Sequence, residues 1–127
     1  MTPSRRQAVA RRAGIARWIR HRFGLASFEE LGLPGGDLVD AGLADLADEK
    51  TTIESLLVSL AEPRLRREGV PLPGVNENPE ERLYELLEKG CGDLAHSRYG
   101  ALVRQITSFA NACHLARIDR SSRASKD

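Results

Sequence analysis

The chain has 127 residues, of which 41% are hydrophobic and 29% charged, and this is the size and composition of one soluble globular domain. No run of 18 apolar residues is present, and the basic N-terminal stretch is not followed by an apolar segment. The sequence therefore predicts neither a membrane span nor a secretory signal. The net charge of +1 is low for a protein that depends on general attraction to nucleic acid.

The charges are strongly segregated along the chain despite the small net charge. Residues 1–24 contain seven arginines and no acid, whereas residues 25–55 contain eight acids and one lysine. Residues 77–93 are again acidic, with six acids and two bases, and residues 94–127 carry six bases and two acids. Blocks of this kind create local fields that the net charge does not reveal, so they indicate surfaces of opposite sign.

Apolar spacing and capping residues predict a series of helices in the first half of the chain. A first helix is expected over residues 2–23, followed by a short helix that begins at Ser27 and is interrupted at Gly32. Asp37 is a suitable N-cap for the next helix, which is expected to end near Asp48.

The second half continues the helical pattern around one proline-rich connection. Thr51 is expected to begin a helix that Pro63 breaks or kinks and Gly69 ends. Residues 70–78 contain two prolines and predict an extended connection, either an exposed loop or a hinge. Residues 79–89 then form the next predicted helix, with a first-turn proline at its start.

The longest predicted helix spans residues 94–116 and begins after Asp93, whose carboxylate can cap its first N–H groups. The glycine-containing turn at residues 90–92 is short, so this helix and the one before it should form an antiparallel hairpin. Apolar residues recur along it at alternating spacings of four and three, which places them on one face: Ala95, Tyr99, Leu102, Ile106, Phe109 and Cys113.

These elements predict an all-α fold, a single compact irregular or orthogonal bundle of five main helices plus one short helix. Residues 1–118 are expected to form this helical domain, and the polar residues 119–127 a disordered basic tail. Cys91 and Cys113 would lie about 33 Å apart along a helix that rises ~1.5 Å per residue, so we expect free thiols. Free thiols are typical of a cytoplasmic protein.

The arginine-rich first helix is the strongest functional signal in the sequence. Arg6, Arg17, Arg20 and His21 share its polar face, and Trp18 stands at the margin of that face. We predict that these residues contact a protein partner with an acidic surface. The same arginines would also suit phosphate groups, with Trp18 stacking on a base, so a nucleic-acid-binding regulator is an alternative function.

Other interpretations of the arginines remain open. They could lie against the acidic residues 37–49 and 77–88 of the same chain, or simply face water. Arg17 and His21 are four residues apart, and could stabilise developing charge and move a proton in a metal-independent helical nuclease. A helix-turn-helix over residues 43–57 is not supported, because its acidic outer face would repel phosphates.

No catalytic, metal or cofactor site is predicted. Residues of ligand type are Cys91, Asp93, His96, Cys113 and His114. The two histidines lie about 27 Å apart at ~1.5 Å per residue, and no CxxC or HxxxH pair is present. The glycines of residues 32–36 lack the Lys and Ser/Thr of a phosphate-binding loop. We therefore expect a non-enzymatic interaction or regulatory module rather than an enzyme.

Overall fold

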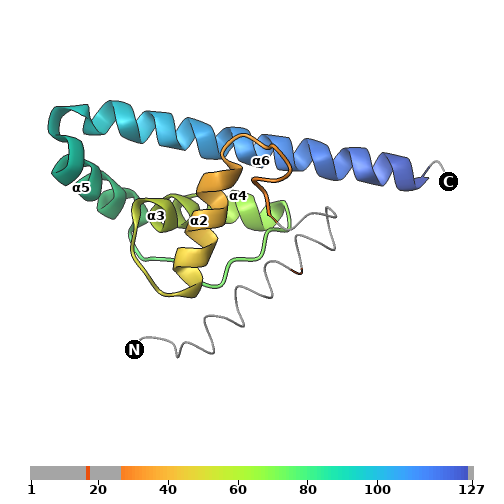
Figure 1. The fold of residues 1–127 in the computed structure, drawn as a ribbon, viewed down its shortest axis with the longest axis horizontal. Helices are drawn as coiled ribbons and strands as arrows, with labels where there is room; N and C mark the ends of the chain where they lie inside the picture. Colours follow the sequence, from red (N-terminus) through yellow and green to blue (C-terminus); the bar gives the residue numbers. More distant parts are fainter. Residues whose placement is uncertain (1–16, 18–26, 126–127) are drawn as a thin grey trace.

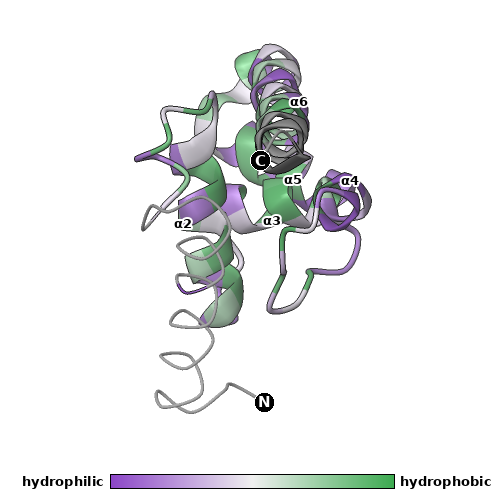
Figure 2. Cartoon of the chain, turned by 90° about the vertical axis from the view of Figure 1, so that its right-hand side faces the viewer, coloured by the Kyte–Doolittle hydropathy of each residue, from purple (hydrophilic) through white to green (hydrophobic). Residues whose placement is uncertain are grey.

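A computed structural model describes Arg17 and residues 27–125 of the chain (Figure 1). The long C-terminal helix, α6 (Ala95–Ser125), is the element along which the other described helices are arranged. Viewed almost along its axis, α6 has α2, α3 and α4 on one side of it, and its last turns extend beyond the other described helices (Figures 1 and 2). The helices before it are α2 (Gly36–Ala47), α3 (Ile53–Leu60), α4 (Glu62–Arg67), α5 (Pro79–Cys91) and the 3₁₀ turn η1 (Gly92–Leu94).

The prediction of an all-α fold is confirmed, since the described residues are helical or irregular and include no strand. The predicted count of five main helices plus one short helix is not matched. Four of the described helices have eight or more residues, and the described part also contains the six-residue α4 and the three-residue η1. The expected first helix over residues 2–23 lies outside the described residues except for the helical Arg17.

The stretch after Ser27 forms successive turns in place of the expected short helix. Its first amides are bound by Asp40 of α2, whose carboxylate oxygens accept from the Phe28 and Glu29 N–H groups at 3.1 and 3.0 Å. Gly32 and Gly35 have positive φ angles of 71° and 75°, which reverse the chain before α2 begins. These bonds hold the turns against α2, while Ser27 Oγ accepts from the Glu30 N–H at 3.3 Å, as the capping pattern indicated.

The helix expected from Thr51 to Gly69 is divided at Ala61 into α3 and α4. Thr52 caps α3, because its Oγ1 accepts from the Ser55 N–H at 3.1 Å and Ser55 Oγ accepts from the Thr52 N–H at 2.8 Å. Pro63 has no N–H to continue the hydrogen-bond ladder, so the chain bends there and α4 starts in a new direction. The predicted break is therefore confirmed.

The predicted connection over residues 70–78 has no helix or strand, and it is only partly exposed: Val75, Glu77 and Asn78 face solvent, while other residues are held against α3 and the core. Val70 and Leu72 are buried in the core. The Asn76 N–H donates to Ser59 Oγ at 2.9 Å, and Asn76 Nδ2 donates to Ser55 Oγ at 3.1 Å. Both serines lie on the buried face of α3, so the connection closes one side of the core.

The apolar stripe predicted for the last helix lines one side of the core. Ala95, Leu102, Ile106, Phe109 and Cys113 are buried, whereas Tyr99 is half-buried at the margin of the stripe. The ring of Phe109 packs edge-on against that of Phe28, with centroids 4.9 Å apart and planes at 81°.

The predicted hairpin of the last two helices is also present, with η1 as its connection. The described backbone of α6 continues as helix to Ser125, where the sequence indicated a disordered tail from residue 119. Arginine and alanine favour helix, and extension of an existing helix costs little once it is nucleated. Within the described residues, no helix combines the length and hydrophobicity needed to cross a membrane.

Helices α2 and α3 approach each other most closely at Gly42. A Cβ atom at this position would overlap the Cγ2 atom of Val58 and would lie 2.6 Å from the carbonyl oxygen of Glu54. We expect Gly42→Ala to lower the free energy of unfolding by about 1–3 kcal/mol, because the helices must separate to admit the methyl group.

A matched control is Gly90→Ala, since a Cβ atom at Gly90 of α5 would have nothing within 4 Å. This change should raise stability by up to about 1 kcal/mol through the better helix propensity of alanine. Urea unfolding of the two variants measures both effects. A Gly42→Ala protein as stable as wild type would contradict the close crossing.

Candidate functional site

The structure describes one of the five residues that the sequence assigns to partner binding. Arg17 is helical and its side chain is exposed. Arg6, Trp18, Arg20 and His21 lie outside the described residues, so whether they form one surface with Arg17 stays a prediction. The described part of the chain contains a second candidate site, which the sequence did not single out.

A cleft with a volume of about 610 Å³ opens between α5 and the first turns of α6. Its lining combines carboxylate, phenol and imidazole side chains: Glu80, Glu81, Tyr84, Glu85, His96 and Tyr99. The volume falls within the range of about 300–1,000 Å³ that is usual for ligand sites.

Helical spacing places these side chains along the two walls. Glu80 and Tyr84 are four residues apart on α5, as are Glu81 and Glu85, so each pair projects from one side of the helix. His96 and Tyr99 are three apart on α6 and share a face in the same way. The core contacts of Leu83 and Leu87 fix the rotation of α5 and so direct its glutamates towards the opening.

The two tyrosines contact each other across the hairpin at the inner side of the cleft. Their ring centroids are 5.8 Å apart and their planes are tilted by 57°. Both rings are half-buried and pack against the hydrophobic core. The cleft therefore has an aromatic wall that is anchored in the fold, with the carboxylates of α5 beside it.

The electrostatics of the cleft are negative. Its three glutamates make no ion pair with another described residue. Arg82, the basic residue within this segment of α5, is directed elsewhere: its guanidinium donates to the Glu77 carbonyl at 3.3 Å and to Thr51 Oγ1 at 3.2 Å. Burial, and secondly the negative charge of Glu80, raise the pKa of Tyr99 above its ordinary value of 10.0. The cleft thus favours a positively charged group.

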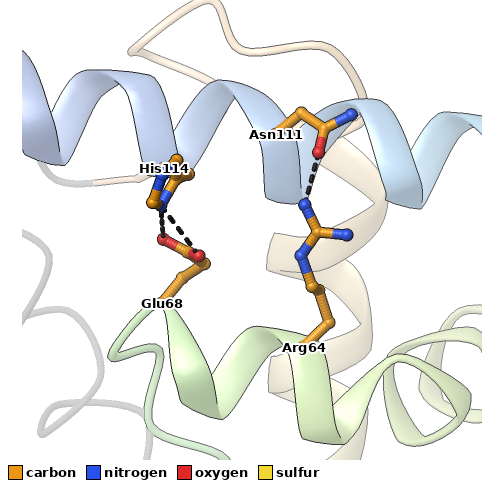
Figure 3. A network of polar contacts seen from close by, with 4 residues as sticks. All are labelled: Arg64, Glu68, Asn111 and His114. Atoms are coloured by element: carbon orange, nitrogen blue, oxygen red, sulfur yellow. Dashed lines mark hydrogen bonds and ion pairs between the residues drawn. The ribbon is translucent and has the colours of Figure 1, made fainter.

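Another set of polar contacts joins α4 to α6 further along α6, at Asn111 and His114 (Figure 3). His114 Nδ1 lies 3.1 and 3.0 Å from the two carboxylate oxygens of Glu68, which is 4% exposed. Arg64 donates to the side-chain oxygen of Asn111 one turn away. Because α4 buries a single residue, Leu65, these contacts attach a short and mostly hydrophilic helix to α6.

The ligand-type residues noted in the sequence are not brought together. Cys113 is buried in the core, His114 contacts Glu68, and the Cys91 thiol donates to the Leu87 carbonyl at 3.1 Å. Across the described part of the chain, no three His, Cys, Asp or Glu side chains are placed so that they could hold a metal ion.

Comparison of the chain with protein-family models, curated proteins and solved structures found no match.

The sequence held a usable signal for the cleft. Residues 77–93 form an acidic block, and the predicted hairpin turns them back onto the start of the last helix, where His96 and Tyr99 stand. Sequence reasoning placed Tyr99 inside the core stripe and so did not connect it with the glutamates. Whether a residue at the edge of an apolar stripe is covered depends on the crossing of the two helices, which spacing alone does not fix.

The pKa of Tyr99 can report directly on the charge of the cleft. In a Tyr84→Phe background, Tyr99 is the remaining tyrosine of the chain, so its titration is followed by tyrosinate absorbance. We expect Glu80→Gln to lower the pKa of Tyr99, because it removes a carboxylate that opposes the phenolate, while the effect of burial persists.

Glu88→Gln is the control for this titration, because Glu88 is exposed on α5 outside the cleft. It should leave the Tyr99 pKa unchanged. The pKa of Tyr99 is higher in the folded than in the unfolded state, so the neutral phenol stabilises the fold. This contribution to the free energy of unfolding is present below pH 10 and is lost as the pH rises through the raised pKa. An unchanged titration in Glu80→Gln would show that this carboxylate does not face Tyr99.

The contacts of Figure 3 predict unequal costs for two alanine substitutions in α6. His114→Ala removes a partner from the nearly buried Glu68 carboxylate and should cost about 1–3 kcal/mol. Asn111→Ala removes an exposed contact to Arg64 and should change stability by no more than about 0.5 kcal/mol. Chemical denaturation at neutral pH measures the difference, and equal effects would refute the ranking.

Proposed function

We propose that the protein is a non-enzymatic helical interaction module of the cytoplasm that contacts an acidic surface of a partner protein through its arginine-rich residues 1–24. The observation that carries this proposal is the exposure of Arg17 within a segment that has seven arginines and no acid. An exposed guanidinium binds carboxylates through paired hydrogen bonds, so a set of them along one segment favours an acidic protein surface.

Two properties of the remaining chain support the same view. Two carboxylates of the acidic residues 25–55 bind groups other than arginine: Asp40 binds two backbone amides, and Asp45 accepts from Thr52 Oγ1 at 2.7 Å. The net charge of +1 also gives little general attraction for nucleic acid, which favours a protein partner over the nucleic-acid alternative.

Affinity capture from an extract of the native host tests this function with a charge-matched comparison. Arg17→Gln/Arg20→Gln should retain at least about fivefold less of a bound partner than wild type, because two charge contacts of roughly 0.5 kcal/mol each are lost. Arg98→Gln/Arg104→Gln changes the net charge equally at two exposed positions of α6 and should retain the partner.

A partner lost equally from both double variants would contradict the assignment to the arginine-rich segment. Gel-shift titration with RNA and DNA at low and moderate salt distinguishes the alternatives. A salt-sensitive shift that Arg17→Gln/Arg20→Gln abolishes would favour the nucleic-acid regulator. Cleavage of the probe by wild type but not by Arg17→Ala would favour the nuclease.

A further inference from the structure

We propose that the cleft between α5 and α6 binds an arginine side chain presented by a basic segment of a partner protein. This is a second site whose preference is opposite in sign to that of residues 1–24, and it does not rest on the function proposed for them.

The walls of the cleft offer both kinds of contact that a guanidinium makes. Tyr84 and Tyr99 provide aromatic faces that are held in place by the core, and a planar cation stacks on such faces. Glu80, Glu81 and Glu85 provide carboxylates beside them, and a carboxylate receives two parallel N–H groups from arginine. A carboxylate next to an aromatic face is thus a fitting site for this side chain.

Some described acids have partners in the fold, and the carboxylates of the cleft differ from these. Asp48 lies near Lys50, Glu62 pairs with Arg66 at 2.6 Å, and Glu68 contacts His114. The three cleft glutamates have no such partner among the residues that the structure describes. Mutual repulsion of like charges in one cleft is relieved when a cation enters, so their arrangement is complementary to positive charge.

A guanidinium suits this cleft better than other cations do. A metal ion requires several close ligands, and the described residues contain no group of three suitable side chains. An ammonium group is a strongly hydrated point charge and gains less from a flat aromatic wall than the planar, weakly hydrated guanidinium does. The volume of about 610 Å³ exceeds that of one guanidinium and leaves room for the backbone that carries it.

The test uses the full chain and a short acetylated, amidated peptide with two arginines separated by glycines. Its matched control replaces both arginines by citrulline, which keeps the shape and removes the charge. Backbone NMR of labelled protein should show saturable shifts at the amides of Tyr84, Glu85, His96 and Tyr99 with the arginine peptide. The citrulline peptide should cause none.

Charge-matched variants then locate the site. Glu80→Gln/Glu85→Gln should weaken binding of the arginine peptide at least about tenfold, because charge-assisted hydrogen bonds are lost. Glu77→Gln/Glu88→Gln removes the same charge from exposed positions outside the cleft and should weaken it less than twofold. Tyr84→Ala should also weaken binding, and Tyr84→Phe should retain it, because stacking needs the ring and not the hydroxyl.

Several results would overturn the proposal. Equal loss in both glutamine double variants would mean general electrostatic attraction, and equal binding of the citrulline peptide would remove the role of charge. Spermidine that binds as tightly as the peptide, with the same dependence on Glu80 and Glu85, would make the occupant a free polyamine. The Arg17→Gln/Arg20→Gln protein is expected to bind the peptide like wild type. The two proposals are therefore tested separately, and loss of the cleft proposal would not contradict the function proposed for residues 1–24.

Discussion

The burial of one face of α6 is the constraint on which the rest of this structure depends. Six apolar side chains from Ala95 to Cys113 are buried against segments that precede them in the chain. The edge-to-face contact of Phe28 with Phe109 fixes where the first described segment meets α6. Each short helix then has one way to bury its own apolar side, because none of them has a core of its own. Close approach at Gly35 adds a second constraint, since a Cβ atom there would lie 2.8 Å from the Gln105 carbonyl oxygen of α6.

Much of this arrangement follows from patterns in the sequence that act locally. The stripe of α6, the break at Pro63 and the α5–α6 hairpin were predicted from spacing and the missing proline N–H, and the structure confirms them. The cap of α3 is Thr52, one residue after the predicted Thr51. Two of the differences involve contacts with distant groups that local patterns do not reveal. The Asp40 carboxylate binds the first amides after Ser27, and Ser55 and Ser59 hold part of the proline-containing connection against α3.

The candidate cleft shows the same division between local and tertiary information. The acidic block of α5 and the side-chain types at the start of α6 are visible in the sequence. Their convergence is not, because it depends on how far the hairpin opens and on which side of the apolar stripe Tyr99 falls. Taken with the arginine-rich N-terminal segment, the cleft gives the chain two charged regions of opposite sign. Charge segregation of this kind favours association with defined partners over nonspecific attraction.

The way α6 extends beyond the helices that cover it has a consequence for its local stability. The half of α6 that carries the core stripe has its apolar face buried. The turns towards Ser125 extend past the other described helices (Figure 1). A helix end without tertiary cover opens without unfolding the domain. Amide hydrogen exchange along this single helix should therefore form a gradient, slow near Leu102 and Ile106 and progressively faster towards the C-terminal turns.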